Sequence, residues 1–341
     1  MPPAVTFWTG NWNPTREAIS KEIEVLRTGL VPGSPVVAFA PTNRTRFSAR
    51  RRVLSLSGRR WLALRGVAAA LEPCGRVTHA FGAMNAWHLL RSLGRRPLVL
   101  TVVIPGPPLP PALYDKVALF VVESERLARS LALAGVAPDR IRTIYPGVDL
   151  ARFRPTAPPP GRFRLLFAST PADPAEFPAR GIPLLVELAR RRPDVEVVFL
   201  WRRWGDQDAA RRALGELRPP DNVTSEWGDV PDMAAALHRV HAVAACFAPD
   251  FGKSCPNSVV EGLACGRPAL LADTCGIADL VTRERAGRCA PRTADALAEA
   301  LDELRADHAA YAARARALAE RHFDQAAFVR DYADVYEAVG A

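Results

Sequence analysis

Residues 251–280 read FGKSCPNSVVEGLACGRPALLADTCGIADL, and this stretch predicts a loop, a short helix and an apolar strand in that order. Asn257 or Ser258 is the expected helix cap, and the glycine and proline after the helix end it before the strand. Glu261 is expected in the first turn of the helix. Backbone amides exposed at a helix start can hold an anion. The stretch therefore predicts either a site for a phosphorylated ligand or a helix start whose polar residues serve only as its N-cap.

Short apolar runs alternate with helical patterns on both sides of this stretch, which is typical of α/β proteins with parallel sheets. Runs of strand length occupy residues 4–8, 35–40, 77–81, 98–104, 117–122, 141–145, 164–168, 195–201, the surroundings of Val223, and 241–247. Helical patterns occupy residues 83–93, 125–134, 181–192, 208–217, 233–237, 294–304 and 311–322. A helix after the first strand is expected to be capped by Asn13, with Pro14 at its first position. The pattern predicts two doubly wound α/β domains.

The proline-rich stretch PTAPPPG at residues 155–161 indicates where the two domains meet. A chain of 341 residues is also large for a single core. We expect an N-terminal domain at residues 1–155, a linker at 156–162, a second domain at 163–322, and a C-terminal helix at 323–341 that packs back toward the N-terminal domain. Ligands of open α/β sheets bind beyond the carboxyl ends of the strands. Two facing rims therefore predict a central cleft that holds a small molecule.

The composition is that of a soluble globular protein, with 49% apolar and 24% charged residues. No segment approaches the roughly 18 consecutive apolar residues that a membrane span needs. The N-terminal sequence MPPAVTFWTGNWNP lacks the basic region and apolar core of a signal peptide, so we expect a cytoplasmic location. The six cysteines form no CxxC pair and have no histidine at zinc spacing, so we expect reduced thiols and no structural metal.

Arginines dominate the segment Arg44–Arg65, and apolar residues are interleaved with them. The eight arginines stand at positions 44, 46, 50, 51, 52, 59, 60 and 65. Such a segment can lie on an anionic lipid surface, where each basic group contributes about 1 kcal/mol. It can also meet a polyanion such as nucleic acid, or it is simply a solvated loop and helix. Of the two partners, we expect the cytoplasmic membrane face rather than nucleic acid.

Three segments resemble the retaining glycosyltransferases of the GT-B fold, family 4. IYPGVDLARFRP at residues 144–155 is similar to the interdomain segment of that family, usually written PNGVD followed by F-x-P. ARGIPLLVEL at residues 179–188 stands in the place of K-G-x-x-x-L-I-x-A. CPNSVVEGLACGRPALLADTCGIADLV at residues 255–281 resembles P-N-x-x-x-E-A-L-A-C-G-x-P-V and the G-G-x-x-E-L-V after it. The order and spacing of the three agree with the family, and the resemblance implies a GT-B fold.

The resemblance implies that the C-terminal domain binds a nucleotide sugar, with UDP- or GDP-sugars as the expected donors and no permanently bound cofactor or metal. Glu261 matches the acid that accepts hydrogen bonds from the donor ribose hydroxyls, as an ionised carboxylate does well. Arg180 stands where the family has a lysine that faces the diphosphate; by itself it would be a surface arginine. Asn257, Ser258 and Val259 match the amides that approach the phosphates. The alternative for Glu261 is a capping box with Ser258, whose spacing is also right.

Two departures from the family pattern concern the donor site. Lys253 stands where the family has an acid that contacts the sugar, and a lysine cannot accept a hydrogen bond. The arginine that usually follows the first strand of the C-terminal domain is replaced by Ala168-Ser169-Thr170. The phosphate contacts would then come from Arg180, the hydroxyl of Ser169 or Thr170, and the 257–259 amides.

The N-terminal domain offers fewer candidate residues. Gly10 and Asn11 follow the first strand, where the family has a glycine-rich loop that touches the donor; an ordinary turn is the alternative. The histidine that the family often carries after the strand at 98–104 is absent. His79 is the nearest candidate for a polar group of the cleft or acceptor side, and a structural histidine is the alternative.

The function expected from the resemblance is transfer of a sugar, with retention of anomeric configuration, to an unknown acceptor such as an envelope or lipid-linked glycan. Retaining enzymes of this fold are thought to use the leaving phosphate as base, so a missing side-chain base does not exclude turnover. A nucleotide-sugar epimerase would need acid–base residues at the rim, and none stands out. The rival from another class is a non-catalytic carbohydrate- or partner-binding protein derived from such an enzyme, which Lys253 and the Ser169-Thr170 replacement motivate.

Overall fold

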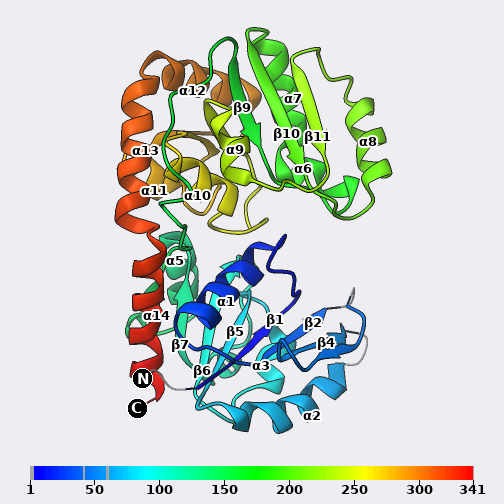
Figure 1. Cartoon of the computed structure of the whole chain (residues 1–341), viewed down its shortest axis with the longest axis vertical. Helices are drawn as coiled ribbons and strands as arrows, with labels where there is room; N and C mark the ends of the chain where they lie inside the picture. Colours follow the sequence, from blue (N-terminus) through cyan, green and yellow to red (C-terminus); the bar gives the residue numbers. More distant parts are fainter. Residues whose placement is uncertain (1–3, 41–42, 59–60, 341) are drawn as a thin grey trace. The chain divides into compact units, whose positions relative to one another are not determined.

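The computed structural model describes residues 4–40, 43–58 and 61–340, and the chain divides into two compact units (Figure 1). The first unit comprises Met1–Gly147 together with Ala326–Ala341, and the second comprises Val148–Gln325. The division falls at Gly147, before the proline-rich stretch. The chain thus leaves the first unit once and returns to it with its last helix.

The first unit is built on a sheet with the strand order β3-β4-β2-β1-β5-β6-β7-β8 among the described residues. All its strand pairs are parallel except β3 with β4, which form an antiparallel hairpin at one edge. The strands are β1 (Val5–Thr9), β2 (Val36–Ala40), β3 (Arg46–Ser48), β4 (Val53–Ser57), β5 (Val77–Ala83), β6 (Leu98–Ile104), β7 (Val117–Val122) and β8 (Ile141–Thr143). The strand order reverses between β1 and β5, as in doubly wound folds.

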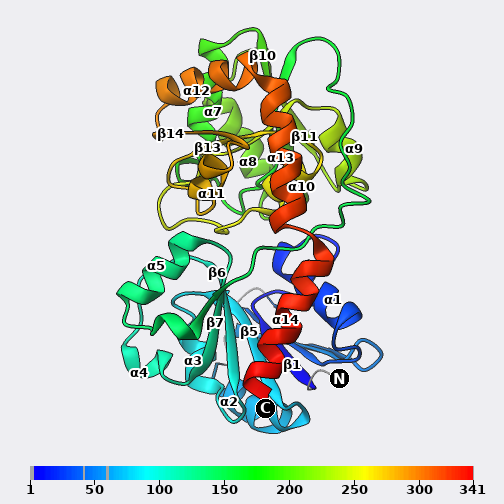
Figure 2. The ribbon, with the colours of Figure 1, turned by 90° about the vertical axis from the view of Figure 1, so that its left-hand side faces the viewer.

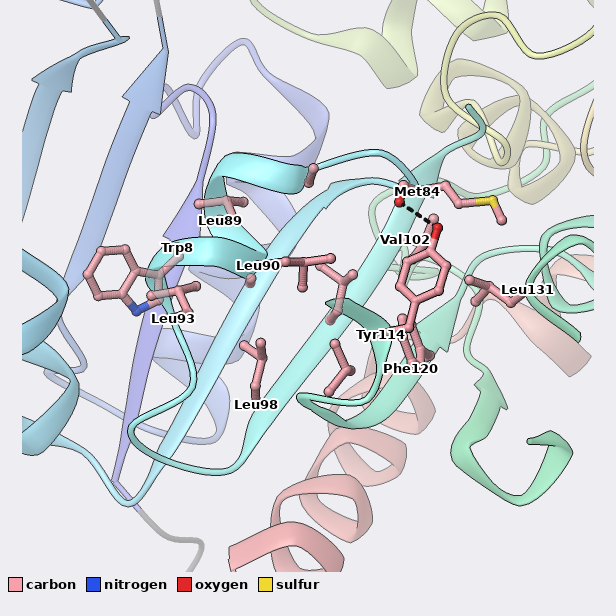
Figure 3. Packing of buried hydrophobic residues seen from close by; sticks show 14 of the residues in the cluster. Trp8, Met84, Leu89, Leu90, Leu93, Leu98, Val102, Tyr114, Phe120 and Leu131 are labelled. Carbon is pink, nitrogen blue, oxygen red and sulfur yellow. Dashed lines mark hydrogen bonds between the residues drawn. The ribbon is translucent and has the colours of Figure 1, made fainter. Parts of the chain in front are cut away.

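Helices cover both faces of this sheet because successive strand residues point to opposite sides. They are α1 (Ala18–Gly29), α2 (Trp61–Leu71), α3 (Trp87–Ser92), α4 (Pro111–Tyr114), α5 (Glu125–Leu133) and α14 (Gln325–Gly340). Trp8 packs in a hydrophobic cluster with residues of α2, α3, α4 and α5, part of which Figure 3 shows. In this cluster the Tyr114 hydroxyl donates a hydrogen bond to the Met84 carbonyl at 3.1 Å. Its neighbour Phe7 packs on the other face with α1 and α14.

The last helix, α14, completes the core of the first unit, and Figure 2 shows it lying along the sheet of that unit. Its buried residues are Phe328, Tyr332, Val335 and Tyr336, which belong to the same cluster as Val5 and Phe7. These four positions follow the helical spacing of an amphipathic stripe. The chain terminus is therefore a core element of the first unit.

The second unit has a parallel sheet with the strand order β11-β10-β9-β12-β13-β14 among the described residues. Its strands are β9 (Phe163–Phe167), β10 (Val195–Trp201), β11 (Val223–Trp227), β12 (Ala242–Ala245), β13 (Ala269–Ala272) and β14 (Gly287–Ala290). Its helices are α6 (Phe177–Arg180), α7 (Ile182–Arg191), α8 (Gln207–Glu216), α9 (Met233–His238), α10 (Asn257–Ala264), α11 (Ala278–Arg283), α12 (Ala294–Ala306) and α13 (His308–His322). In chain order this is 3-2-1-4-5-6, the Rossmann order.

Two arginines attach the segment after Gly147 to the second unit. Arg316 of α13 donates from Nη1 to the Phe153 and Ala264 carbonyl oxygens, at 2.8 and 2.9 Å. Arg267 is buried and donates from Nη2 to the Thr156 hydroxyl at 2.7 Å and from Nε to the Leu237 carbonyl at 3.1 Å. The start of the proline-rich stretch is thereby fixed to the second unit.

Several helix starts differ from the sequence prediction. The first helix begins at Ala18 rather than at Pro14, because the Glu17 carboxylate, not Asn13, caps it by accepting from the Ser20 amide at 2.6 Å. Helix α3 begins at Trp87, because β5 continues to Ala83. The hairpin formed by β3 and β4 was not predicted. Within the described residues no helix has both the length and the apolarity needed to span a bilayer.

Candidate functional site

The carboxyl ends of β9 and β12 mark the point in the second unit where the strand order reverses. Helices connect to opposite faces of the sheet there, which leaves a crevice beyond the strand ends. Strand β9 runs into Ala168-Ser169-Thr170, and β12 runs into Cys246 and Phe247. The loops from these two strands are therefore the first place to look for a ligand site in this unit.

Arg180, the last residue of α6, lies at this point and is held by three groups. Its Nη1 donates to the Ser169 hydroxyl at 2.5 Å, and its Nε and Nη2 contact Glu176 Oε2 at 2.8 and 2.7 Å. The guanidinium carbon lies 5.3 Å from the ring centroid of Phe251. The structure thus joins Arg180 and Ser169, two residues that the sequence offered separately. A fixed guanidinium at a strand end is suited to bind an anion.

Gly181 allows the arginine to come this close to the sheet. It has φ 77°, and a methyl group on its α-carbon would lie 2.3 Å from the carbonyl oxygen of Cys246. Only glycine adopts this backbone conformation without strain and without that clash. The Ala248 amide donates to the Ala179 carbonyl at 2.7 Å on the same side. The backbones before and after Gly181 are therefore held directly against the end of β12.

Arg292, which the sequence did not single out, is hydrogen-bonded to the same two loops. It follows β14, and its Nε donates to the Cys246 carbonyl at 3.0 Å while its Nη2 donates to the Pro178 carbonyl. Thr274, after β13, donates from its hydroxyl to the Phe247 carbonyl at 2.5 Å. Both residues stand in loops at the carboxyl ends of strands, which is the signal that could have found them.

The start of α10 differs from the prediction in its cap. Pro256 occupies the N-cap position and makes no side-chain cap, so Asn257 and Ser258 both lie inside the helix. The Val259 amide already donates to the Pro256 carbonyl at 3.0 Å. The amides of Asn257 and Ser258 precede it and are the ones that a helix start leaves for a ligand. Among the described residues, Asn257 Oδ1 is a buried oxygen without a hydrogen-bond partner.

Glu261 lies in the second turn of α10, not the first, and is buried, with 7% of its surface exposed. Because Ser258 is not the N-cap, the capping-box interpretation of Ser258 and Glu261 is wrong. Glu261 is therefore a buried acid of α10, and capping of the helix by Ser258 does not account for it.

The remaining candidates of the second unit have backbone partners. Lys253 Nζ donates to the Cys255 carbonyl at 3.0 Å within the loop that leads to α10. The Thr170 hydroxyl accepts from the Arg202 amide at 3.1 Å, which joins the loops after β9 and β10. Gly276 packs against Ser254 so closely that a methyl group there would lie 2.0 Å from the Ser254 hydroxyl. The loop with Lys253 is therefore packed against the turn after β13.

The three candidates of the first unit have different surroundings. Gly10 has open space beside it, with no heavy atom within 4 Å of a methyl group placed there, and its carbonyl accepts from Asn43 Nδ2 at 3.0 Å. The Asn11 carbonyl accepts from the Ser20 hydroxyl at 3.1 Å. Both residues follow β1 at the point where the strand order of this sheet reverses. They remain candidates for ligand contact.

His79 is fully buried and does not face a cleft, which corrects the acceptor-side assignment. Its Nδ1 lies 2.7 Å from the Tyr336 hydroxyl, and its Nε2 lies 2.7 Å from the Thr101 hydroxyl. Burial lowers the pKa of His79 to about 3, so the ring is neutral at physiological pH. The histidine has a structural role beneath α14.

Cys246 and Cys265 of the second unit are buried thiols. All six cysteines are free. Burial raises the pKa of Cys246 well above its usual range and that of Cys265 to about 12, so neither is a thiolate near neutral pH. Among the described residues, no three histidine, cysteine, aspartate or glutamate side chains gather in a way that could hold a metal ion.

Residues 170–307, which contain Arg180, α10 and Arg292, match the model of the family Glycosyl transferases group 1. The matched segment covers most of the second unit. The chain as a whole has the GT-B fold of two parallel-sheet units. It is similar to the crystal structure of Alr3699/HepE from Anabaena in complex with UDP, with a TM-score of 0.75 and 17% identity over 98% of this chain and 100% of the other.

A second solved structure has the same fold, and a relative matches over part of its length. Sucrose-phosphate synthase from Thermosynechococcus elongatus has a TM-score of 0.76 and 16% identity, and covers 98% of each chain. A D-inositol 3-phosphate glycosyltransferase of Pseudarthrobacter chlorophenolicus is 28% identical over 177 residues, which is 48% of this chain and 41% of the relative. The matched segment thus spans less than half of that relative's length.

Proposed function

We propose that this protein is a retaining glycosyltransferase that moves a sugar from a nucleotide-sugar donor, a UDP- or GDP-sugar, to a hydroxyl of a glycan or lipid-linked glycan. The observation that carries the proposal is the contact of Arg180 with Ser169 at the point where the strand order reverses. Arg180 lies within the segment that matches Glycosyl transferases group 1, and Ser169 directly precedes that segment. The complexes of Alr3699/HepE with UDP and with UDP-glucose support the choice of donor class.

Arg180 and the start of α10 would bind the donor diphosphate. A guanidinium forms charge-assisted hydrogen bonds that are about twice as strong as neutral ones. The Asn257 and Ser258 amides add the positive end of a helix. Negative charge on the diphosphate grows as the glycosidic bond breaks, so these groups stabilise the transition state more than the bound donor. Ser169 and Glu176 hold Arg180 in place for that task.

Glu261 would accept hydrogen bonds from the two ribose hydroxyls of the donor. Two vicinal hydroxyls can each donate to one oxygen of a carboxylate, and a buried carboxylate makes such bonds strong. Lys253 is proposed to contact the sugar. Because an ammonium group only donates, it favours a donor or acceptor with a carboxylate or a hydroxyl oriented to accept. Gly10 and Asn11 of the first unit are proposed to contact a ligand through their backbone.

Retention is proposed to proceed on the front face of the sugar, with the leaving phosphate as the base that takes the proton of the acceptor hydroxyl. This route needs no carboxylate nucleophile. It requires instead that the leaving group be held rigidly, which is the task proposed for Arg180. The anomeric configuration of the product, determined by NMR spectroscopy, tests this part.

Calorimetric titration of the whole chain with UDP, GDP and their sugars tests the donor proposal. Replacement Glu261→Ala should weaken binding about tenfold to a hundredfold, the effect of losing hydrogen bonds to a charged group. Glu299→Ala, on the exposed side of α12, is the matched control and should bind as the wild type does. If no nucleoside diphosphate binds the wild-type protein, the proposal is wrong.

A non-catalytic carbohydrate- or partner-binding protein is the second candidate. Lys253 in place of an acid, and Ala168-Ser169-Thr170 in place of an arginine, favour it. Such a protein would bind a sugar or nucleotide without turnover. Release of free nucleotide from a donor above the uncatalysed rate, or transfer to an acceptor detected by mass spectrometry, would dismiss it.

A further inference from the structure

The net positive charge of the chain originates in one segment. Residues 25–71 contain nine arginines and no aspartate or glutamate. The net charge of the whole chain is +9, so outside this segment basic and acidic residues are equal in number. A charge excess confined to one segment creates a local positive potential rather than a diffuse one.

The structure places five of these nine arginines in the edge hairpin of the first unit, which we call the basic hairpin (residues 44–57). Strand β3 pairs antiparallel with β4 and is the edge strand of the sheet among the described residues. Arg44, Arg46, Arg50 and Arg51 are exposed, the last two in the turn between the strands. Phe47, between them, is 69% exposed. Arg59 and Arg60 lie outside the described residues, as do the side chains of residues 61–63.

The arginines of the hairpin differ from many arginines of the second unit in their partners. Ten arginines of the second unit form ion pairs with aspartate or glutamate, at positions 164, 190, 191, 192, 211, 239, 288, 305, 316 and 321. Within the described part of the chain, Arg44, Arg46, Arg50 and Arg51 form none. Their charge is therefore available to an anion outside the protein. Arg52 is different, because its Nη1 donates to the Gly33 carbonyl at 2.9 Å.

Charged residues on an edge strand also serve to prevent sheets from pairing with each other. That purpose does not require an exposed phenylalanine, which would promote such association. An aromatic ring beside four unpaired arginines instead matches a lipid surface. The arginines reach the phosphate groups there, and the ring enters the boundary of the acyl chains.

We propose that the basic hairpin binds the surface of a bilayer that contains anionic lipids. The inference goes beyond glycosyl transfer and does not require it. Each arginine near such a surface strengthens binding about fivefold. The attraction falls off within the Debye length, so binding weakens as salt is added.

Co-sedimentation of the whole chain with vesicles tests the proposal, using phosphatidylcholine alone and phosphatidylcholine mixed with phosphatidylglycerol. The wild type should bind the mixed vesicles and not the neutral ones. Arg50→Gln with Arg51→Gln should weaken binding about 30-fold, and Phe47→Ser about tenfold. Arg162→Gln with Arg212→Gln removes the same charge from exposed positions of the second unit and should change binding less than about twofold. Because all these side chains are exposed, the melting temperatures should stay equal.

Three results would overturn the proposal. One is failure of the wild type to bind the mixed vesicles. Another is an equal loss in the hairpin pair and the control pair, which would mean that only the total charge matters. The third is binding of duplex DNA that depends on Arg50 and Arg51 while vesicle binding does not, which would assign the hairpin to nucleic acid.

Discussion

His79 Nδ1 lies 2.7 Å from the hydroxyl of Tyr336, a residue 257 positions further along the chain. The other ring nitrogen contacts Thr101, whose hydroxyl lies 2.8 Å from that of Tyr332. Four buried polar groups thus connect the middle of the first sheet with the last helix. Buried hydrogen-bond chains of this kind are stabilising only while every member is satisfied.

Replacing Tyr336 by phenylalanine should therefore destabilise the protein. The substitution leaves a nitrogen of His79 buried without a partner, at a cost of about 1–3 kcal/mol in the free energy of unfolding. Urea denaturation followed by circular dichroism measures the loss. Tyr311 is half-buried, and its ring lies under the guanidinium of Arg314, a contact that phenylalanine keeps. Tyr311→Phe is therefore a suitable control and should change stability by less than about 0.5 kcal/mol. Equal stability of Tyr336→Phe and the wild type would contradict the expected network.

The pH dependence of stability should report the buried histidine. The pKa of His79 is about 3 in the folded protein, against 6.5 for the ordinary side chain, so the unfolded chain binds the extra proton first. Above pH 6.5 the ring is neutral in both the folded and the unfolded chain. As the pH falls from 6.5 toward 3, only the unfolded chain binds a proton, so the free energy of unfolding decreases. The loss at pH 5 should be about 2 kcal/mol. A His79→Gln variant keeps a polar side chain without this titration, so its stability should vary less between pH 7 and pH 5.

Removing the guanidinium of Arg180 should weaken binding of nucleoside diphosphates. Arg180→Ala is expected to bind about tenfold to a hundredfold more weakly, and Arg180→Lys should recover part of the loss because it keeps the charge but not the fork. Isothermal titration calorimetry checks both. The exposed Arg212→Ala is the control. Wild-type affinity in Arg180→Ala would exclude the arginine from the donor site.

Substitution of Gly181 should be costly because of its conformation. Gly181→Ala introduces strain at φ 77° and a clash with the Cys246 carbonyl, so a loss of more than about 2 kcal/mol is expected. Gly215, inside α8, has no heavy atom within 4 Å of an added methyl group. Gly215→Ala should stabilise the protein by up to about 1 kcal/mol. The two melting curves should therefore shift in opposite directions.

Arg292 should matter for the geometry of the loops it joins. Arg292→Gln removes donors to the Cys246 and Pro178 carbonyls, and amide hydrogen exchange of Ala248 should accelerate because its bond to Ala179 loses support. Nucleotide affinity should fall together with the protection. Unchanged exchange at Ala248 would show that the loops hold each other without Arg292.

The sequence predicted the central strands of the second sheet well because they are short apolar runs buried on both faces, such as Val195–Trp201. The edge strand Gly287–Ala290 contains an arginine and was not predicted. Helix starts were predicted less well. Asn13 and Glu17 can each cap a helix, and the Ser20 hydroxyl, which contacts Glu17 and Asn11, favours the later start. The strand Arg46–Ser48 has three residues and no apolar period, so no pattern could reveal it.

In the candidate site, motif spacing pointed to Arg180 and α10, but it could not show which groups contact each other. The partners of Arg292 are backbone carbonyls. Because every residue has one, the sequence could not predict which carbonyls Arg292 contacts. The capping-box interpretation was wrong for a related reason. Pro256 sets the helix start through its backbone, while Ser258 only has the right spacing. Burial of His79 depended on a helix at the other end of the chain.

The return of α14 to the first unit has a consequence for synthesis on the ribosome. Residues 148–325 emerge after most of the first unit but before Phe328, Tyr332, Val335 and Tyr336, which complete its core. At the usual rates of translation, the face of the sheet that α14 covers waits about 10–40 s for these side chains. The second unit can fold during that interval. During synthesis the second unit can therefore be folded while the first unit still lacks its last helix.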